Sequence, residues 1–470
     1  MRTLMPHTVA LAALALACVV AQPAAAQTDF IQVTDDSTGH CGSFLPAASG
    51  DAAVIVFEST CDLTGDNADG NREIFLLDGE ALDQITQSQG CANTSPVVND
   101  TGTRVAFESS CNLAGSNADA NTEIFLWKSG GGGISQLTQT TSALCDNLAP
   151  TITAAASNAF VAFDSNCSTH PGNTDGSFEI FRVSEAGNIT PLTNGTDCDS
   201  ISASGNAAGT LYAYESDCDP AGTNPDFAIE IFTATSGAAI TQVTRAGDDA
   251  CSSLSPAIDG TGSFIAFESD CDFDGEGNDN SDASAEIFRV AAVQDGAVVQ
   301  LTDDDGSSTC ASVQPVIASG GSVVAFSSFC DLGGDNEDGS LEVFRVAVGS
   351  DPEQMTESAG CSSLATAVDS SGDEILFDSD CDLTGDNADD SREIFRAGPE
   401  LACVCGAPVT GASPPLASDA LAILRGAVGA RVCPPCACDT DASGAIVTQD
   451  ALRALRKAVG ADIDLTCPPA

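Results

Sequence analysis

The chain has 470 residues, and its 68 acidic side chains against 15 basic ones give a formal charge of −53. A nucleic-acid-binding protein needs a lysine and arginine surface to replace the counterions of the phosphates, so this balance excludes nucleic acid as a partner. It argues equally against an anionic membrane surface. Because 43% of the residues are hydrophobic and 21 are phenylalanine, the chain can still form a large folded core.

Residues 1–26 have the pattern of a secretory signal peptide. Arg2 supplies a positive charge, residues 8–21 are apolar, and small alanines precede Gln27. The apolar stretch is too short to span a bilayer, and no later one reaches about 18 residues, so no transmembrane segment is expected. A lipoprotein that is lipidated at Cys18 is the alternative, but the residues before this cysteine match the lipobox poorly. We expect a secreted protein, extracellular or at the cell surface, with the periplasm as an alternative.

Residues 27–400 contain a sevenfold repeat whose units are 50 to 59 residues apart. Each unit has an apolar segment ending in cysteine, a loop rich in Gly, Asn and Asp, and a segment of the type Glu-Ile-Phe. These last segments begin at Glu73, Glu123, Glu179, Glu230, Glu286, Glu342 and Glu393. Turn residues between β-branched and aromatic runs predict four short strands per unit, which is the size of a propeller blade. The predicted fold class is all-β, a seven-bladed β-propeller with four-stranded blades.

The two ends of the repeat complement each other. The seventh unit stops after residues 393–396 without a fourth strand, whereas residues 30–34 form a spare strand before the first unit. We expect the N-terminal strand to complete the last blade and to close the ring without a covalent bond. An open β-solenoid or two smaller sheets is the alternative.

The pattern Ser-Pro, Asp-Gly-Thr-Gly, Ile-Ala-Phe-Glu-Ser, Glu-Ile-Phe and Gln-Leu-Thr is clearest in residues 255–302. It resembles the TolB-like, WD-like (PD-type) β-propeller repeat, and the resemblance covers residues 30–397. Members of that family range from protein-binding platforms to appendages of hydrolases, so the resemblance implies a fold and leaves the function open. The cysteine pair in each unit departs from the usual repeat.

Fourteen cysteines form seven pairs, six of them 20 residues apart and one 22 residues apart. The pairs are Cys41 and Cys61, Cys91 and Cys111, Cys145 and Cys167, Cys198 and Cys218, Cys251 and Cys271, Cys310 and Cys330, and Cys361 and Cys381. A hairpin folded at the midpoint places each pair opposite each other, about 4.5–5.5 Å apart at Cα, which a disulfide can bridge. In an exported chain we therefore predict one disulfide per hairpin, with metal binding as the alternative.

The loops after the second cysteines repeat the element Asn-x-Asp with Glu four residues later. It occurs as Asn67/Asp69/Glu73, Asn117/Asp119/Glu123, Asn173/Asp175/Glu179, Asn224/Asp226/Glu230, Asn336/Asp338/Glu342 and Asn387/Asp389/Glu393, whereas unit five has a longer insertion. Such residues favour ordinary turns, and alternating oxygens are also typical of weak calcium sites; both interpretations stay open. The loops should share one side of the ring, which gives an acidic face for cations, a basic partner or a saline solvent.

Residues 401–470 differ in composition and contain two amphipathic helix patterns, at residues 419–429 and 450–460. Six cysteines accompany these helices. A zinc site of Cys403, Cys405, Cys433 and Cys436 fits the spacing, but an exported chain favours disulfides.

The segment 439–450 matches a calcium loop, with oxygens at positions 1, 3 and 5, glycine at position 6 and a carboxylate at position 12. The predicted calcium ligands are Asp439, Asp441, Ser443, the carbonyl of Ala445 and Asp450. The equivalent first loop, 408–419, has no acid before Asp419 and is expected to hold no ion.

Paired loops of this kind, closed by Asp and leading into helices, resemble dockerin modules. The resemblance implies a cohesin-like protein partner for residues 401–470. The positions implied to contact it are Thr448, Gln449, Arg453, Arg456 and Lys457. A small disulfide-bonded domain with one structural ion is the alternative.

No GxSxG, HExxH, P-loop or dinucleotide motif occurs, and the mature chain has only His40 and His170. We therefore favour a non-catalytic binding, scaffold or display protein, monomeric, whose propeller takes a carbohydrate or peptide ligand and whose calcium module serves attachment. The carboxylates are too numerous for any pair to stand out. An extracellular polysaccharide-active hydrolase or lyase with an axial propeller site is the alternative.

Overall fold

The computed structural model describes residues 28–468 with short gaps. The gaps are 37–39, 80, 143, 221, 246–250, 274–279, 281, 304–309, 335, 400–404, 407–414, 416, 429–432, 434 and 462. The predicted signal peptide, Cys403 and most of the predicted empty loop lie outside the described residues.

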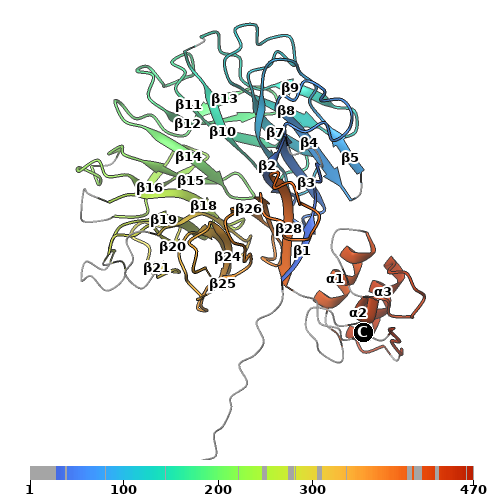
Figure 1. Ribbon diagram of the computed structural model, residues 1–470. Helices are drawn as coiled ribbons and strands as arrows, with labels where there is room; N and C mark the ends of the chain where they lie inside the picture. Colours follow the sequence, from blue (N-terminus) through green and yellow to red (C-terminus); the bar gives the residue numbers. More distant parts are fainter. Residues whose placement is uncertain are drawn as a thin grey trace, which may run out of the picture.

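Seven antiparallel four-stranded sheets are arranged around an axis as the blades of a propeller (Figure 1). The predicted seven-bladed β-propeller is thereby confirmed. Blade 1 consists of β2 (Ser43–Ala48), β3 (Val54–Ser59), β4 (Glu73–Asp78) and β5 (Ala81–Gln84), and blade 2 of β6 (Asn93–Val98), β7 (Arg104–Ser109), β8 (Glu123–Lys128) and β9 (Gly133–Gln136). Blade 3 consists of β10 (Asn147–Ile152), β11 (Phe160–Ser165), β12 (Glu179–Ser184) and β13 (Ile189–Pro191), and blade 4 of β14 (Ser200–Gly205), β15 (Leu211–Ser216), β16 (Glu230–Thr235) and β17 (Ile240–Gln242).

Blades 5 to 7 repeat the plan. Blade 5 consists of β18 (Ser253–Ile258), β19 (Phe264–Ser269), β20 (Glu286–Ala291) and β21 (Val298–Gln300), and blade 6 of β22 (Ser312–Ile317), β23 (Val323–Ser328), β24 (Glu342–Ala347) and β25 (Glu353–Gln354). Blade 7 consists of β26 (Ser363–Val368), β27 (Ile375–Ser379), β28 (Glu393–Pro399) and β1 (Thr28–Gln32). The first strands of neighbouring blades contact one another around the whole ring, including β26 with β2, so they lie innermost.

The ring closes through the N-terminal strand, as expected. β1 pairs antiparallel with β28, with Phe30 opposite Ala397, and supplies the outer strand of blade 7. The Val33 N–H donates to the Ile394 carbonyl at 2.7 Å, and the Ile394 N–H donates to the Thr34 hydroxyl at 2.8 Å. The two ends of the propeller are therefore joined by a β-ladder.

Each sheet is buried on both faces because blades pack on each other. The second and third strands of every blade place two aromatic rings opposite each other, as in Phe57 and Phe75, whose stacked centroids are 5.6 Å apart. Between blades, side chains such as Val56, Leu76 and Phe107 form one apolar cluster per joint. This double burial explains why the Ala-Phe and Ile-Phe runs are apolar without alternation.

The structure joins all seven predicted cysteine pairs by disulfides, from Cys41–Cys61 in blade 1 to Cys361–Cys381 in blade 7. Their Cα atoms are 4.9–5.4 Å apart. Each bond ties the start of the first strand to the end of the second, within one hairpin. Such bonds indicate an extracellular or periplasmic protein.

The C-terminal part contains α1 (Ala417–Ala427), α2 (Pro435–Cys438) and α3 (Thr448–Ala458). Ile423 of α1 and Ala454 of α3 share a small buried cluster with the Cys433–Cys438 disulfide. Cys405 is bonded to Cys467, and Cys436 is also in a disulfide. The alternative zinc site is therefore wrong, because three of its four cysteines have no free thiolate.

No helix within the described ranges is long and apolar enough to cross a membrane.

Replacing Cys91 and Cys111 together by alanine tests the role of the blade disulfides. We expect the free energy of unfolding to fall by about 3 kcal/mol, because the unfolded chain loses a closed loop. Urea unfolding of the oxidised protein measures this loss. A loss below about 1 kcal/mol would show that blade packing alone holds the hairpin.

Candidate functional site

In each of the seven blades an oxygen of the second strand binds the first strand of the next blade. Glu58 Oε2 accepts the Ser95 N–H at 2.8 Å, and Asp378 Oδ2 accepts the Leu45 N–H at 3.0 Å, which carries the pattern from blade 7 to blade 1. We name these seven side chains the latch ring. Its members are Glu58, Glu108, Asp164, Glu215, Glu268, Ser327 and Asp378.

The backbone that receives a latch carboxylate lies at a bulge in the first strand. In blades 1 to 6 the donating residue is not glycine and has a φ between 49° and 59°. These donors are Leu45, Ser95, Ala149, Ser202, Ser255 and Gln314. Such a conformation is unfavourable for a residue with a Cβ. In blade 7, where the hydroxyl of Ser327 replaces the carboxylate, the donor Ala365 does not have this conformation. The charged acceptor and the strained bulge therefore occur together.

Burial raises the pKa of the latch carboxylates. The pKa of Asp164 rises to about 8, because desolvation outweighs the hydrogen bonds from Ser202 and Ala203 and because Glu215 and Glu108 carry like charge nearby. Asp164 is therefore largely protonated at pH 7. Desolvation also raises the pKa of the other five carboxyls, Glu58, Glu108, Glu215, Glu268 and Asp378.

Two latch carboxylates are paired with arginine. Arg72 forms an ion pair with Glu58, and Arg392 forms one with Asp378. Both arginines directly precede the Glu-Ile-Phe segment of their blade. The latch ring is thus occupied in holding neighbouring blades together: one oxygen of each of its seven side chains accepts a backbone N–H of the next blade.

The glutamate that begins each third strand is also buried, with at most 1% of its surface exposed. Glu123 Oε1 accepts the Thr140 N–H at 2.5 Å, and Glu123 Oε2 accepts the Asn147 amide at 3.0 Å. In blade 3, desolvation raises the pKa of Glu179 to about 7. Because all seven blades bury this glutamate at the same position, we assign it to the blade framework and not to a single catalytic centre.

Neither histidine has the surroundings of a general base. His40 is exposed. His170 is buried against Phe163 and Phe181, and its Nε2 lies 2.7 Å from Asn147 Oδ1. Desolvation lowers the pKa of His170 to about 4, so it is neutral at pH 7.

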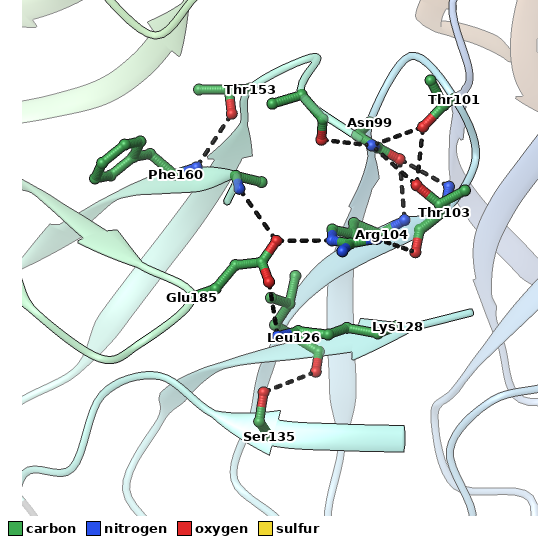
Figure 2. A network of polar contacts seen from close by, with 12 residues as sticks. Asn99, Thr101, Thr103, Arg104, Leu126, Lys128, Ser135, Thr153, Phe160 and Glu185 are labelled. Atoms are coloured by element: carbon green, nitrogen blue, oxygen red, sulfur yellow. Dashed lines mark hydrogen bonds and ion pairs between the residues drawn. The ribbon is translucent and has the colours of Figure 1, made fainter. Parts of the chain in front are cut away.

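A charged network joins blades 2 and 3. Glu185 binds Arg104 Nε and Lys128 Nζ, each at 2.7 Å, and also accepts the Ala159 N–H (Figure 2). Although burial opposes it, the bonds from Lys128 and Arg104 hold the pKa of Glu185 at about 2.

The loops between the second and third strands all emerge at one end of the blades, because the blades repeat one antiparallel topology. The asparagine that recurs in each repeat holds the loop in place. In blade 1, Asn67 Nδ2 donates to the carbonyls of Cys61 and Asn71, at 3.3 and 2.9 Å. We call this end of the propeller, which also carries the disulfides, the loop face. In blade 1 the acidic side chains of Asp62, Asp66 and Asp69 are exposed there.

Pockets open on the loop face. One of ≈ 400 Å³ lies between blades 3 and 4 and is lined by residues that include Gly195, Tyr214 and Phe227. Another of ≈ 430 Å³ is lined by residues that include Asp338 and Glu357.

The predicted calcium residues of the C-terminal part lie together. Asp439, Asp441 and Asp450 each place a carboxylate oxygen within 4.8 Å of the other two. The Ser443 hydroxyl lies 3.3 Å from Asp439 Oδ1 and 3.1 Å from the Ala445 carbonyl. Among the described residues, this is the cluster of at least three His, Cys, Asp or Glu side chains that contains no disulfide cysteine. Its oxygen chemistry suits calcium.

Sequence reasoning missed the latch ring and one loop element. The signal for the latch ring was the acidic residue before Ser in the Phe-Glu-Ser segments. The sequence interpretation gave this residue no role. In blade 5 the expected insertion still contains the loop element, as Asn280, Asp282 and Glu286. Asn280 Nδ2 donates to the Ser284 carbonyl at 2.8 Å, as its counterparts do.

Searches of family models and of curated protein sequences find no match. Among solved structures, the chain is similar to an oligogalacturonate lyase from Vibrio parahaemolyticus, with 10% identity, a TM-score of 0.51, and coverage of 79% of this chain and 97% of that chain. An oligogalacturonate lyase in complex with manganese matches at 11% identity and a TM-score of 0.50, covering 79% of this chain and 96% of that one. A putative TolB from Agrobacterium tumefaciens gives 14% identity and a TM-score of 0.38, covering 59% of this chain and 84% of that one.

The pH dependence of stability tests the electrostatics of the latch ring. Carboxyls with a raised pKa bind more protons in the folded than in the unfolded state, whose pKa values are about 4. Their stabilisation is full below that value and is lost as pH rises towards 8, the pKa of Asp164. In the presence of a metal chelator, the midpoint temperature of unfolding should therefore be higher at pH 5 than at pH 8.

Asp164→Asn should reduce this difference, because an amide oxygen still accepts the Ser202 N–H but does not titrate. The exposed Asp83→Asn variant serves as the control and should keep the full difference. A midpoint that is equal or higher at pH 8 in the unmodified protein would contradict the assignment.

The likenesses to the two oligogalacturonate lyase structures, at 10% and 11% identity, show the fold alone, and the chain itself forms a seven-bladed β-propeller.

Proposed function

We propose that this is a secreted, non-catalytic binding or display protein. The propeller serves as a rigid platform, and the C-terminal part is a calcium-binding, dockerin-like module for attachment to a protein partner. The observation that carries the proposal is the use of the buried acidic residues: six latch carboxylates each accept a backbone N–H of the next blade. These six buried carboxylates are thus part of the blade joints.

Rigidity supports the platform role. Every blade carries a disulfide in its inner hairpin, so the first and second strands are covalently tied where they meet the loop face. A ligand that binds the loop face therefore meets a surface that loses little conformational entropy on binding.

Exposed apolar side chains support the attachment role. Leu421 and Leu424 of α1 are 51% and 39% exposed, and Leu452 and Leu455 of α3 are 46% and 40% exposed. The two pairs are 31 residues apart, so the duplicated helices present the same residue types to solvent. Exposed apolar side chains that recur in this way suit a protein partner.

The positions that the dockerin resemblance implies lie on α3 beside these side chains. Thr448, Gln449 and Arg456 are exposed. Arg453 and Lys457 donate to the carbonyls of Asp464 and Ile463, at 2.8 and 2.7 Å, and so also hold the C-terminal segment.

The alternative remains a polysaccharide-active lyase or hydrolase. It is supported by the likeness to two oligogalacturonate lyase structures, which extends to the fold alone. Incubation of the mature protein with polysaccharide and peptide panels, with and without calcium, separates the two functions. We expect binding without turnover; robust turnover of any substrate would refute the non-catalytic function.

The calcium loop has its own test. Asp441→Ala should bind one calcium ion fewer than the unmodified full-length protein, because Asp441 supplies an exposed oxygen at the third loop position. Equilibrium dialysis with metal analysis counts the ions. Asp464→Ala, outside the loop, is the matched control and should leave the number unchanged; equal numbers for both variants would refute the site.

A further inference from the structure

Four side-chain oxygens converge in the loop of blade 7. The residues alternate along the chain as Asn387, Asp389, Ser391 and Glu393. The Ser391 hydroxyl lies 3.1 Å from Asn387 Oδ1, 3.1 Å from Asp389 Oδ1 and 2.9 Å from Glu393 Oε1. A strand-like alternation thus turns all four side chains towards one point.

Blades 5 and 6 repeat the arrangement. The Ser340 hydroxyl lies 3.3, 2.8 and 3.0 Å from the oxygens of Asn336, Asp338 and Glu342. In blade 5 the corresponding distances from the Ser284 hydroxyl are 3.4, 3.1 and 3.2 Å. The convergence is therefore a property of the repeat.

One hydroxyl hydrogen cannot satisfy three acceptors, so at least two of these oxygen contacts have no hydrogen between them. Oxygens that are each about 2.3–2.6 Å from a common calcium ion lie roughly 3 Å from one another. The observed separations of 2.8–3.4 Å match the edges of such a coordination shell.

Blades 1 and 2 supply an independent observation, because asparagine replaces the serine. In blade 2, Asn117 and Asn121 are only 2% and 5% exposed, and neither Oδ1 has a hydrogen-bond partner. Both amide nitrogens are engaged, with Asn117 Nδ2 bonded to the Asn121 carbonyl at 2.9 Å and Asn121 Nδ2 bonded to Thr140. In blade 1 the Oδ1 atoms of Asn67 and Asn71 are likewise buried without a partner.

In blades 1 and 2 the buried Oδ1 atoms of Asn67 and Asn117 belong to the first asparagine of the element, whereas the amide nitrogen of Asn71, at the serine position, donates to Glu73 Oε1 at 3.0 Å. The first asparagine of each element contacts the side chain at the serine position in blades 5 to 7. Buried oxygens at this point require a donor or a cation. Since each loop adds the two carboxylates of its Asp and Glu, a divalent cation fits better than water.

Two blades lack the arrangement. Blade 4 has Ala228 at the serine position and so no side-chain oxygen there. In blade 3, Asn173 Oδ1 accepts the Gly176 N–H at 3.0 Å, and the exposed Ser177 hydroxyl bonds to Asp175. These loops are internal negative controls.

We propose that the loops of blades 1, 2, 5, 6 and 7 each bind one calcium ion through the Asn, Asp, Ser or Asn, and Glu side chains of this element. In blades 1, 2, 6 and 7 the Asp at the second position is exposed, which leaves a path for entry of the ion. The proposal concerns the propeller alone and does not depend on the C-terminal loop.

Calcium counting on the full-length mature protein tests the proposal. In the Asp441→Ala background, equilibrium dialysis at a few millimolar calcium, the range of extracellular modules, should give about five ions. Adding Asp389→Ala should remove one ion. Adding Asp226→Ala, the equivalent exposed aspartate in blade 4, should remove none.

The thermal midpoint gives a second readout. It should rise on addition of calcium even in the Asp441→Ala variant, because ions bound only by the folded state stabilise it. The proposal is overturned if this variant binds no calcium, or if Asp389→Ala and Asp226→Ala bind equal numbers. If only the C-terminal loop fails to bind calcium, the number of calcium ions bound by the Asp441→Ala variant is unchanged.

Discussion

The joint between two blades is the contact on which the rest of the structure depends. A single four-stranded blade cannot bury either face alone, so its aromatic pair is covered only when a neighbour packs on each side. At every joint the apolar cluster is accompanied by an oxygen from one blade that accepts an N–H of the next. Burial of the apolar clusters thus holds the blades against one another without fixing a direction. The hydrogen bond from the latch oxygen is directional and fixes the angle between neighbouring blades.

The charged acceptor has a consequence for the backbone. A buried carboxylate is costly unless hydrogen-bonded, and a bulge with positive φ is costly unless something holds it. In six joints the two unfavourable features satisfy each other, whereas at the joint with the serine hydroxyl the irregularity at Ala365 has no positive φ. Some of the acidic residues are therefore buried in the blade joints, although composition alone would place them on the surface.

The sequence predicted the blade number, the closing strand and the pairing of the cysteines, because each of these follows from a regular spacing. Hairpin symmetry about a midpoint determines which residues face each other, so Cys91 could be paired with Cys111 without knowing the tertiary structure. The latch ring could not be predicted in this way. Glu58 acquires its role from its contact with Ser95 in the next blade. The spacing of the repeats does not show which group of the neighbouring unit a residue contacts. The loop of blade 5 was missed for a simpler reason: an inserted segment shifted Asn280 from the expected spacing, although its hydrogen bonds are those of the other blades.

The covalent bonds of the propeller are all local, since each links cysteines 20 or 22 residues apart within one hairpin. In the secretion that we propose, both cysteines of a hairpin would reach the oxidising compartment almost together, so each bond could form before the following blade emerged. The ring itself is completed by hydrogen bonds of β1, the first strand to emerge, with β28, the last strand of the propeller. Oxidation and closure are thus separate events: an intermediate that carries all seven bonds is still an open chain of blades, and its final step requires no redox chemistry.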